Sequence, residues 1–156
     1  MAKDRNAEIV AALIESYWME LETTLNYIAN STNLDGVLAE PIKVALALDV
    51  TAELGHAQSL AKRIHELGGT VPGSLAFKPV QKSEQPPEDS TDVLHVIKGV
   101  IDGEQAACVQ YKRIIKLCEG DDYVTQELCI GLMGQEEAHL REFVGFRREY
   151  EKRASR

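Results

Sequence analysis

TAELGHAQ, residues 51–58, and GQEEAHLR, residues 134–141, share one pattern, a glutamate followed three positions later by a histidine. On an α-helix, side chains three positions apart lie on the same face, so each pair can present a carboxylate and an imidazole to one metal ion. Both stretches fall near the middle of long helical patterns, where they can face the interior of a bundle. The two pairs are Glu53 with His56 and Glu136 with His139.

Single glutamates in two other helical stretches complete a set of metal ligands. Glu22 lies in WMELETTLNY, residues 18–27, and Glu104 lies in VIDGEQAACV, residues 100–109. All four glutamates are expected in the middle third of their helices, as ligands of one site require. Four carboxylates and two imidazoles are the ligand set of a two-iron or two-manganese carboxylate site. The expected metal ligands, which are also the expected catalytic residues, are Glu22, Glu53, His56, Glu104, Glu136 and His139.

Four helical stretches are expected to cover most of the chain. In the first, apolar residues recur at Val10, Leu13 and Tyr17, close to the helical period. Gly68 is typical of a position just after a helix, and Asp92 of a helix start. No alternation of the β-strand type competes with these patterns, so the expected fold class is all-α. The expected helices span residues 6–30, 37–67, 91–119 and 122–153.

A proline-rich polar segment, residues 70–90, separates the second helix from the third. An extended chain of this length can reach about 70 Å. A helix of about 28 residues is only about 42 Å long. The segment can therefore run the length of a bundle and let the second and third helices lie parallel, each within its own antiparallel hairpin. The expected architecture is a four-helix bundle with one long crossover, built as a single domain over residues 1–156.

Composition excludes several other classes of protein. The chain has 156 residues, with 44% hydrophobic and 27% charged, which is ordinary for a globular domain. Charges interrupt every apolar stretch, so no membrane span is expected, and residues 1–10 do not resemble a signal peptide. The net charge of −8 disfavours nucleic-acid binding. Cys108, Cys118 and Cys129 match no zinc spacing, which favours a reduced, cytoplasmic setting.

Several residues resemble site residues but have simpler interpretations. Glu137 is expected to face solvent because it is off the three-residue spacing to His139. His65 is expected to be exposed at a helix end, and His95 is interpreted as a surface residue one turn after the Asp92 cap. The basic C-terminal residues alternate with glutamates and are expected to form a solvated helix face. Trp18 and Tyr111 are expected in the core, with contact to the site left open for both.

With these motifs in place, the chain resembles the ferritin-like superfamily, and within it the bacterioferritin branch. The resemblance covers nearly the whole chain. Beyond the ligand positions it is strongest in three stretches: ELETTLNYIAN at residues 20–30, HAQSLAKRIHELGGTVP at residues 56–72, and DDYVTQELCIGLMGQEEAHL at residues 121–140.

The resemblance implies a di-iron ferroxidase. It implies that two Fe ions per subunit, with Mn or Zn as possible substitutes, are held in the bundle and that Fe(II) is oxidised by O2 or H2O2 in iron detoxification or storage. Carried over by position, His56 and Glu22 would be terminal ligands of one iron, His139 and Glu104 would be terminal ligands of the other, and Glu53 and Glu136 would bridge the two ions.

Two departures from the bacterioferritin pattern change what is expected. Bacterioferritin has a haem-ligating methionine directly after the first bridging glutamate, whereas this chain has Leu54, so no haem is expected. Residues 140–156 are too few to finish the fourth helix and add the fifth helix of the 24-subunit shell. A homo-oligomer other than that shell is therefore expected, either a dimer formed through the first two helices or a larger assembly.

Three other functions fit parts of the pattern. A rubrerythrin-like di-iron peroxidase or oxidoreductase would consume peroxide without storing mineral. Because no Cys-x-x-Cys motif is present, its electron donor would have to be separate. A manganese or structural metal bundle would have no redox turnover. A Dps-like shell would bind DNA, which the net negative charge disfavours.

Overall fold

The computed structural model describes residues 2–155, with side-chain environments from residue 5 onward. Within residues 2–155 the secondary structure is helical and no strand is present, which confirms the all-α fold class. The elements are α1 (Ala2–Asn33), α2 (Glu40–Glu66), the short 3-10 helix η1 (Ser74–Ala76), α3 (Val93–Cys118) and α4 (Tyr123–Ala154).

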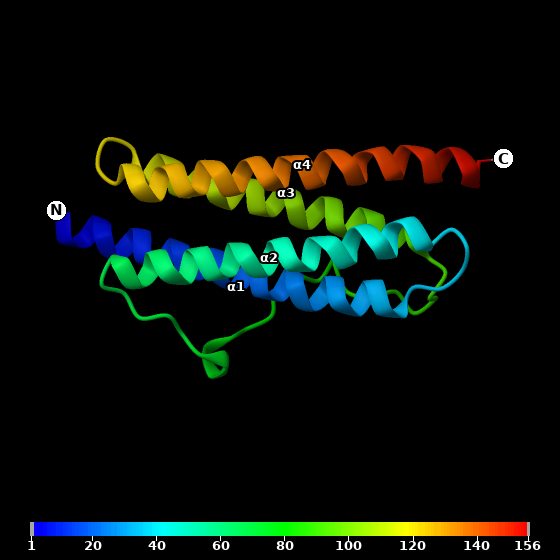
Figure 1. Cartoon of the computed structure of the whole chain (residues 1–156), viewed down its shortest axis with the longest axis horizontal. Helices are drawn as coiled ribbons and strands as arrows, with labels where there is room; N and C mark the ends of the chain where they lie inside the picture. Colours follow the sequence, from blue (N-terminus) through cyan, green and yellow to red (C-terminus); the bar gives the residue numbers. More distant parts are fainter. Residues whose placement is uncertain (1, 156) are drawn as a thin grey trace.

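The four long helices form a bundle with one long crossover, as expected. Figure 1 shows α1 and α2 as one antiparallel hairpin and α3 and α4 as a second hairpin lying against it. The segment from residue 67 to residue 92, named the crossover below, returns along the bundle past η1, so that α2 and α3 run in the same direction (Figure 1). This is the ferritin-like topology.

The hairpin turn between α1 and α2 is shorter than its polar sequence suggests. Helix α1 continues through the polar residues 31–33 and ends at Asn33, while α2 begins only at Glu40. The buried side chains of Leu34 and Ala39 anchor the turn in the core. Gly36 between them has φ +94, a left-handed conformation that glycine adopts readily. The end of α1 at Asn33 sets the level at which residues of that helix face the middle of the bundle.

Aspartates cap the N-termini of the second hairpin's helices. The Asp92 carboxylate accepts a hydrogen bond of 3.0 Å from the backbone N–H of His95, and Asp122 accepts one of 3.0 Å from that of Thr125. Each cap satisfies a backbone donor that the helix leaves unpaired, and such caps typically contribute about 1 kcal/mol. The capping interpretation of Asp92 is thus confirmed, and the side chain of His95 is exposed.

The hydrophobic core has two parts on either side of a polar layer. One cluster surrounds Tyr27, Leu46, Ile97 and Phe143, near the α1–α2 turn. The other cluster surrounds Leu13, Leu60, Ile114 and Cys129, near the α3–α4 turn. The polar layer between them consists of buried charged and polar residues in the middle of each helix. The fold therefore places a polar site at mid-height and seals it at both ends with apolar side chains.

The crossover packs closely on α3 at two glycines. A Cβ on Gly99 would overlap the backbone carbonyl oxygen of Ser83, and a Cβ on Gly103 would overlap the carboxylate of Glu84. The absence of side chains at these positions lets the backbone of the crossover lie against the helix. Within residues 2–155, no helix combines the length and apolarity that crossing a membrane requires.

We expect Gly99→Ala to destabilise the protein by about 1–3 kcal/mol, because its methyl group meets a backbone atom that cannot swing aside. Gly131→Ala on α4 is the matched control, since no atom lies within 4 Å of the point that its added Cβ would occupy. That substitution should stabilise the protein by up to about 1 kcal/mol through helix propensity alone. Urea denaturation followed by circular dichroism measures both effects. Equal stabilisation by the two substitutions would contradict the close packing.

Candidate metal centre

Six ionisable side chains meet in the polar layer. Their positions match in height, because each glutamate lies thirteen or fourteen residues from the end of its helix nearest the hairpin turn. In the first hairpin, Glu20 precedes the end of α1 and Glu53 follows the start of α2 by the same interval. The assembled residues are Glu20 from α1, Glu53 and His56 from α2, Glu104 from α3, and Glu136 and His139 from α4.

These side chains form two overlapping groups. Glu20 and His56 belong to the first group, Glu104 and His139 belong to the second, and Glu53 and Glu136 belong to both. Within each group, one ligand atom per residue can be chosen so that all chosen atoms lie within 4.8 Å of one another. Two ions placed in these groups would share two carboxylates, which is the arrangement that bridging ligands require.

Each histidine turns its Nδ1 atom toward the carboxylates. His56 Nδ1 lies 2.8 Å from Glu136 Oε1 and 3.5 Å from Glu20 Oε2. His139 Nδ1 lies 3.3 Å from Glu53 Oε1, with Glu136 Oε2 at 3.5 Å and Glu104 Oε1 at 3.6 Å. His56 Nδ1 also lies 3.7 Å from Glu53 Oε2. Each imidazole therefore contacts the glutamate three positions before it and the corresponding glutamate of the other Glu-x-x-His pair.

The outer nitrogen of each histidine has a partner of its own. His56 Nε2 lies 3.0 Å from the amide oxygen of Gln135, and His139 Nε2 lies 3.6 Å from a carboxylate oxygen of Asp49. Partners of this kind fix the orientation of a metal-binding imidazole and raise its basicity. Neither Gln135 nor Asp49 follows a recognisable metal-binding spacing, so the sequence pattern did not indicate them.

Two buried tyrosines connect the hairpins at the site. The Tyr27 hydroxyl on α1 donates a hydrogen bond of 2.6 Å to Glu104 on α3. The Tyr111 hydroxyl on α3 donates a short hydrogen bond to Glu20 on α1. Contact of Tyr111 with the site, which the sequence left open, is therefore observed.

The buried donor atoms of the centre fit metal ions. Glu20, Glu53, Glu104 and Glu136 are each 3% exposed or less. Glu53 Oε1, both oxygens of Glu136 and the Nδ1 atoms of both histidines have no hydrogen-bond partner, because their close contacts are poorly aligned. Unpaired buried polar atoms are unfavourable unless a cation satisfies them. Carboxylates with imidazoles suit iron or manganese in particular.

Without metal, bound protons balance the charge of the cluster. Burial raises the pKa of Glu20 well above its usual range, and burial raises that of Glu104 to about 9. Although burial opposes ionisation, contacts with the histidines lower the pKa of Glu136, and contacts with Glu20 and the histidines lower that of Glu53.

The histidines complete this balance. Contacts with Glu104, Glu136 and Glu53 raise the pKa of His139 to about 12. Burial disfavours the charge on His56, but contacts with Glu136, Glu20 and Glu53 outweigh it and raise its pKa. Two carboxylates and two imidazolium rings then balance one another in the metal-free protein.

Binding of two divalent ions near pH 7 should release about four protons, two from carboxylic acids and two from imidazolium rings, because ligands must be deprotonated. The apparent affinity should therefore rise with pH. Zn(II) titration calorimetry in buffers of different ionisation enthalpy, or a pH indicator in weak buffer, counts the protons. Uptake of two ions with no proton release would contradict the charge balance.

The structure does not bring Glu22 to the cluster, so its expected place there is wrong. Its carboxylate instead accepts hydrogen bonds from the backbone N–H groups of Val80 at 2.7 Å and Gln81 at 2.8 Å in the crossover. Residues two apart on a helix point about 200° apart around its axis, so Glu20 and Glu22 cannot face the same site. Glu20 occupies the interior position.

One signal in the sequence and one in the structure point to Glu20. Glu20 precedes Tyr27 by seven residues, and Glu104 precedes Tyr111 by seven, so α1 and α3 carry the same pair on one face. The height of the ligand is the second signal, because the true end of α1 places Glu20, and not Glu22, level with Glu53.

The other residues that resemble site residues lie away from the cluster. Glu137 and His65 are exposed, as expected. Trp18 is not among the six clustered residues and packs its ring against Tyr17 at 4.9 Å and Phe77 at 5.2 Å between centroids. Leu54, at the position of the bacterioferritin haem methionine, is 43% exposed on α2. The absence of haem stays a prediction.

Comparison with known proteins places this architecture in a family. A family model of the ferritin-like domain matches residues 10–152. The chain therefore belongs to the ferritin-like family.

Two relatives illustrate the range of similar proteins. The bacterioferritin of Desulfovibrio desulfuricans is 31% identical over 143 residues, which cover 88% of this chain and 73% of that protein. Its crystal structure, solved with a diiron site in different catalytic states, superposes with a TM-score of 0.81 and 25% identity over 97% of this chain and 85% of that one. A dodecameric thioferritin, the bacterioferritin-related protein of Bacteroides fragilis, has the same fold, with a TM-score of 0.82 and 18% identity over 96% and 90% of the two chains.

Proposed function

We propose that this protein is a ferroxidase that binds two Fe(II) ions in the bundle and oxidises them with O2 or peroxide, in iron detoxification or storage. The observation that supports the proposal most directly is the pair of overlapping ligand groups sharing Glu53 and Glu136. The diiron site of the D. desulfuricans bacterioferritin, a relative over most of this chain, adds support.

Each side chain would then have a defined task. Glu20 and His56 would hold one ion, Glu104 and His139 would hold the other, and the two shared glutamates would contact both. When bound, two Fe(II) ions supply one electron each to the oxidant. Manganese or zinc would fit the same donor set without this turnover.

The surrounding groups orient the ligands and limit the access of water. Gln135 and Asp49 fix the planes of the imidazoles through their outer nitrogens. Tyr27 and Tyr111 hold the terminal carboxylates with O–H donors, so each terminal glutamate has one oxygen positioned by a tyrosine. The apolar clusters above and below exclude bulk water from the layer.

Aerobic addition of Fe(II) to the apo-protein, followed by absorbance in the near ultraviolet, tests the proposal. An early phase of about two irons per subunit, faster than oxidation in buffer, is expected. Iron retained through gel filtration then separates a storing ferroxidase from a rubrerythrin-like peroxidase, which would consume peroxide and retain no mineral. The absence of a fast phase would contradict both functions.

Replacing Glu20 and replacing Glu22 should have opposite consequences. Glu20→Ala removes a terminal ligand and should weaken the binding of mainly one ion, by about 10-fold to 100-fold or more. Glu22→Ala should retain both ions and lose stability instead, since it leaves two backbone N–H groups of the crossover without their partner. Elemental analysis after Mn(II) loading, with a thermal melt of each variant, distinguishes the two effects. Loss of metal from Glu22→Ala alone would reverse the assignment.

We also propose that the protein assembles as a homo-oligomer through α1 and α2. Leu25 and Ile28 on α1, and Val44 and Leu48 on α2, are 47–69% exposed. Within each helix the two residues are three or four positions apart and so lie on one face. Apolar side chains exposed in neighbouring positions are typical of an interface.

Leu48→Glu should shift the assembly toward smaller species, because it places a charge in the apolar surface. Val109→Glu on α3 is the matched control, since Val109 is equally exposed, at 70%, but lies outside α1 and α2. Light scattering during size-exclusion chromatography gives the mass of each variant. An unchanged mass for Leu48→Glu, or an equal shift for both variants, would contradict this interface.

A further inference from the structure

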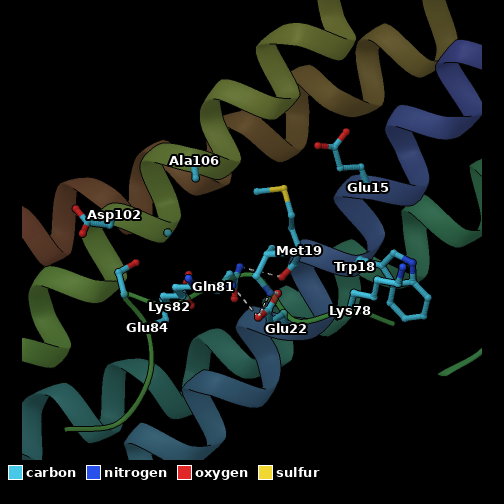
Figure 2. A pocket seen from close by; sticks show the side chains of 13 residues that line it. Glu15, Trp18, Met19, Glu22, Lys78, Gln81, Lys82, Glu84, Asp102 and Ala106 are labelled. Carbon is cyan, nitrogen blue, oxygen red and sulfur yellow. Dashed lines mark hydrogen bonds between the residues drawn. The ribbon is translucent and has the colours of Figure 1, made fainter. Parts of the chain in front are cut away.

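A cavity of about 600 Å³ is lined by α1, the crossover and α3. We call it the crossover cavity. Figure 2 shows Trp18, Met19 and Glu22 of α1 on one side, the crossover at its base, and Asp102 of α3 on the other side. The cavity lies outside the metal centre, and none of the six clustered residues lines it.

Glu84 of the crossover is the unusual residue of this cavity. Its side chain lines the cavity, yet the residue is only 2% exposed. Neither carboxylate oxygen has a hydrogen-bond partner. The neighbouring Asn26 amide donates a hydrogen bond of 3.0 Å to Gln81. Figure 2 shows the Glu84 carboxylate extending from the crossover toward α3, into the space that Gly103 leaves by having no side chain.

The acidic groups around Glu84 would attract a cation. Burial and the charges of Glu53 and Glu22 raise the pKa of Glu84 to about 8, and the nearby Asn26 amide only partly opposes them. An arriving divalent ion would displace this proton and relieve the repulsion. The oxygens of Glu22 are occupied by backbone N–H groups of the crossover, so Glu84 offers the free carboxylate. Lys78 and Lys82 only partly offset the four acidic residues that line the cavity.

The crossover cavity adjoins the metal centre. Met19, Gln81 and Gly103 line it and also line a second, much smaller cavity of about 10 Å³. That small cavity is bounded by Glu20, Glu53, Glu104 and Glu136 of the centre. The two cavities therefore share part of their lining, and the smaller one reaches the ligands.

We propose that the crossover cavity is a binding site for a hydrated divalent cation, held by Glu84 with Asp102 nearby, and that ions pass through it to the metal centre. A six-water shell occupies roughly 180 Å³ at the liquid volume of water, so the ion can enter with its waters. This inference rests on the proposed function, because it assumes that the centre takes up divalent ions.

Trp18 provides a direct readout. It is the sole tryptophan of the chain and lines the cavity. Co(II), which air does not readily oxidise with these ligands, quenches nearby indole fluorescence and absorbs visible light once coordinated by protein side chains. Stopped-flow mixing of the full-length protein with Co(II) should therefore give a fast quenching phase as the ion enters the cavity. A slower absorbance phase, ending at two ions per subunit, should follow as the centre fills.

Glu84→Gln should abolish the fast quenching phase and slow the filling of the centre by about tenfold, as expected for loss of electrostatic attraction along a path. The final number of ions at the centre should stay at two. Glu88→Gln is the matched control, since Glu88 is an exposed glutamate on the same segment, and both phases should be unchanged. Glu53→Ala should keep the fast phase and lose the absorbance phase.

Gly103→Ala is a second test that leaves the charge of the cavity intact. Its methyl group would displace the Glu84 carboxylate and should also weaken the fast phase, while alanine favours the helix. Thermal melts establish that each variant is folded. Wild-type kinetics in Glu84→Gln would overturn the cavity proposal, and the proposed function would stand if two ions still bind. If the wild-type centre takes up no Co(II) the proposed function fails, whereas a quenching phase that depends on Glu84 would still support the cavity site.

Discussion

The burial of four carboxylates at one level of a helical bundle is the constraint on which the rest of this structure depends. Ionised carboxylates are strongly disfavoured away from water unless charges or donors of opposite sign surround them. In this protein two tyrosine hydroxyls donate to the terminal glutamates, and two histidines whose pKa is raised lie against the carboxylates. Apolar clusters above and below supply the packing that holds this polar layer in place.

The polar layer also joins the two hairpins. Tyr27 of the first hairpin holds Glu104 of the second, and Tyr111 of the second holds Glu20 of the first. His56 of the first hairpin likewise contacts Glu136 of the second. The buried carboxylates of each hairpin therefore find hydrogen-bond donors or imidazoles on the other hairpin, in the middle of the bundle. The repeated order along the chain, a Glu with a Tyr seven residues later and then a Glu with a His three residues later, produces this approximate twofold arrangement.

The sequence predicted the features that a single helix determines. The pair Glu53 and His56 could be recognised because residues three positions apart lie on one face of a helix. The four helices could be predicted from their apolar periodicity. The choice between Glu20 and Glu22 depended on where α1 ends. The polar residues 31–33 suggested an early turn, but α1 continues through them and ends next to the buried Leu34. Asp49 and Glu84 had no pattern at all, since their roles arise only when distant segments meet.

Glu22 shows how neighbouring residues of one helix divide two tasks. Glu20 turns inward to the centre, while Glu22 turns outward and holds the crossover through its backbone N–H groups. The glycines of α3 let the crossover lie against that helix from the other side. The crossover, whose one helix is the short η1, is thereby fixed at both edges, and the oxygens of its buried Glu84 have no hydrogen-bond partner. The long crossover therefore does more than connect parallel helices, because it forms a wall of the space through which the centre is reached from the α1–α3 side.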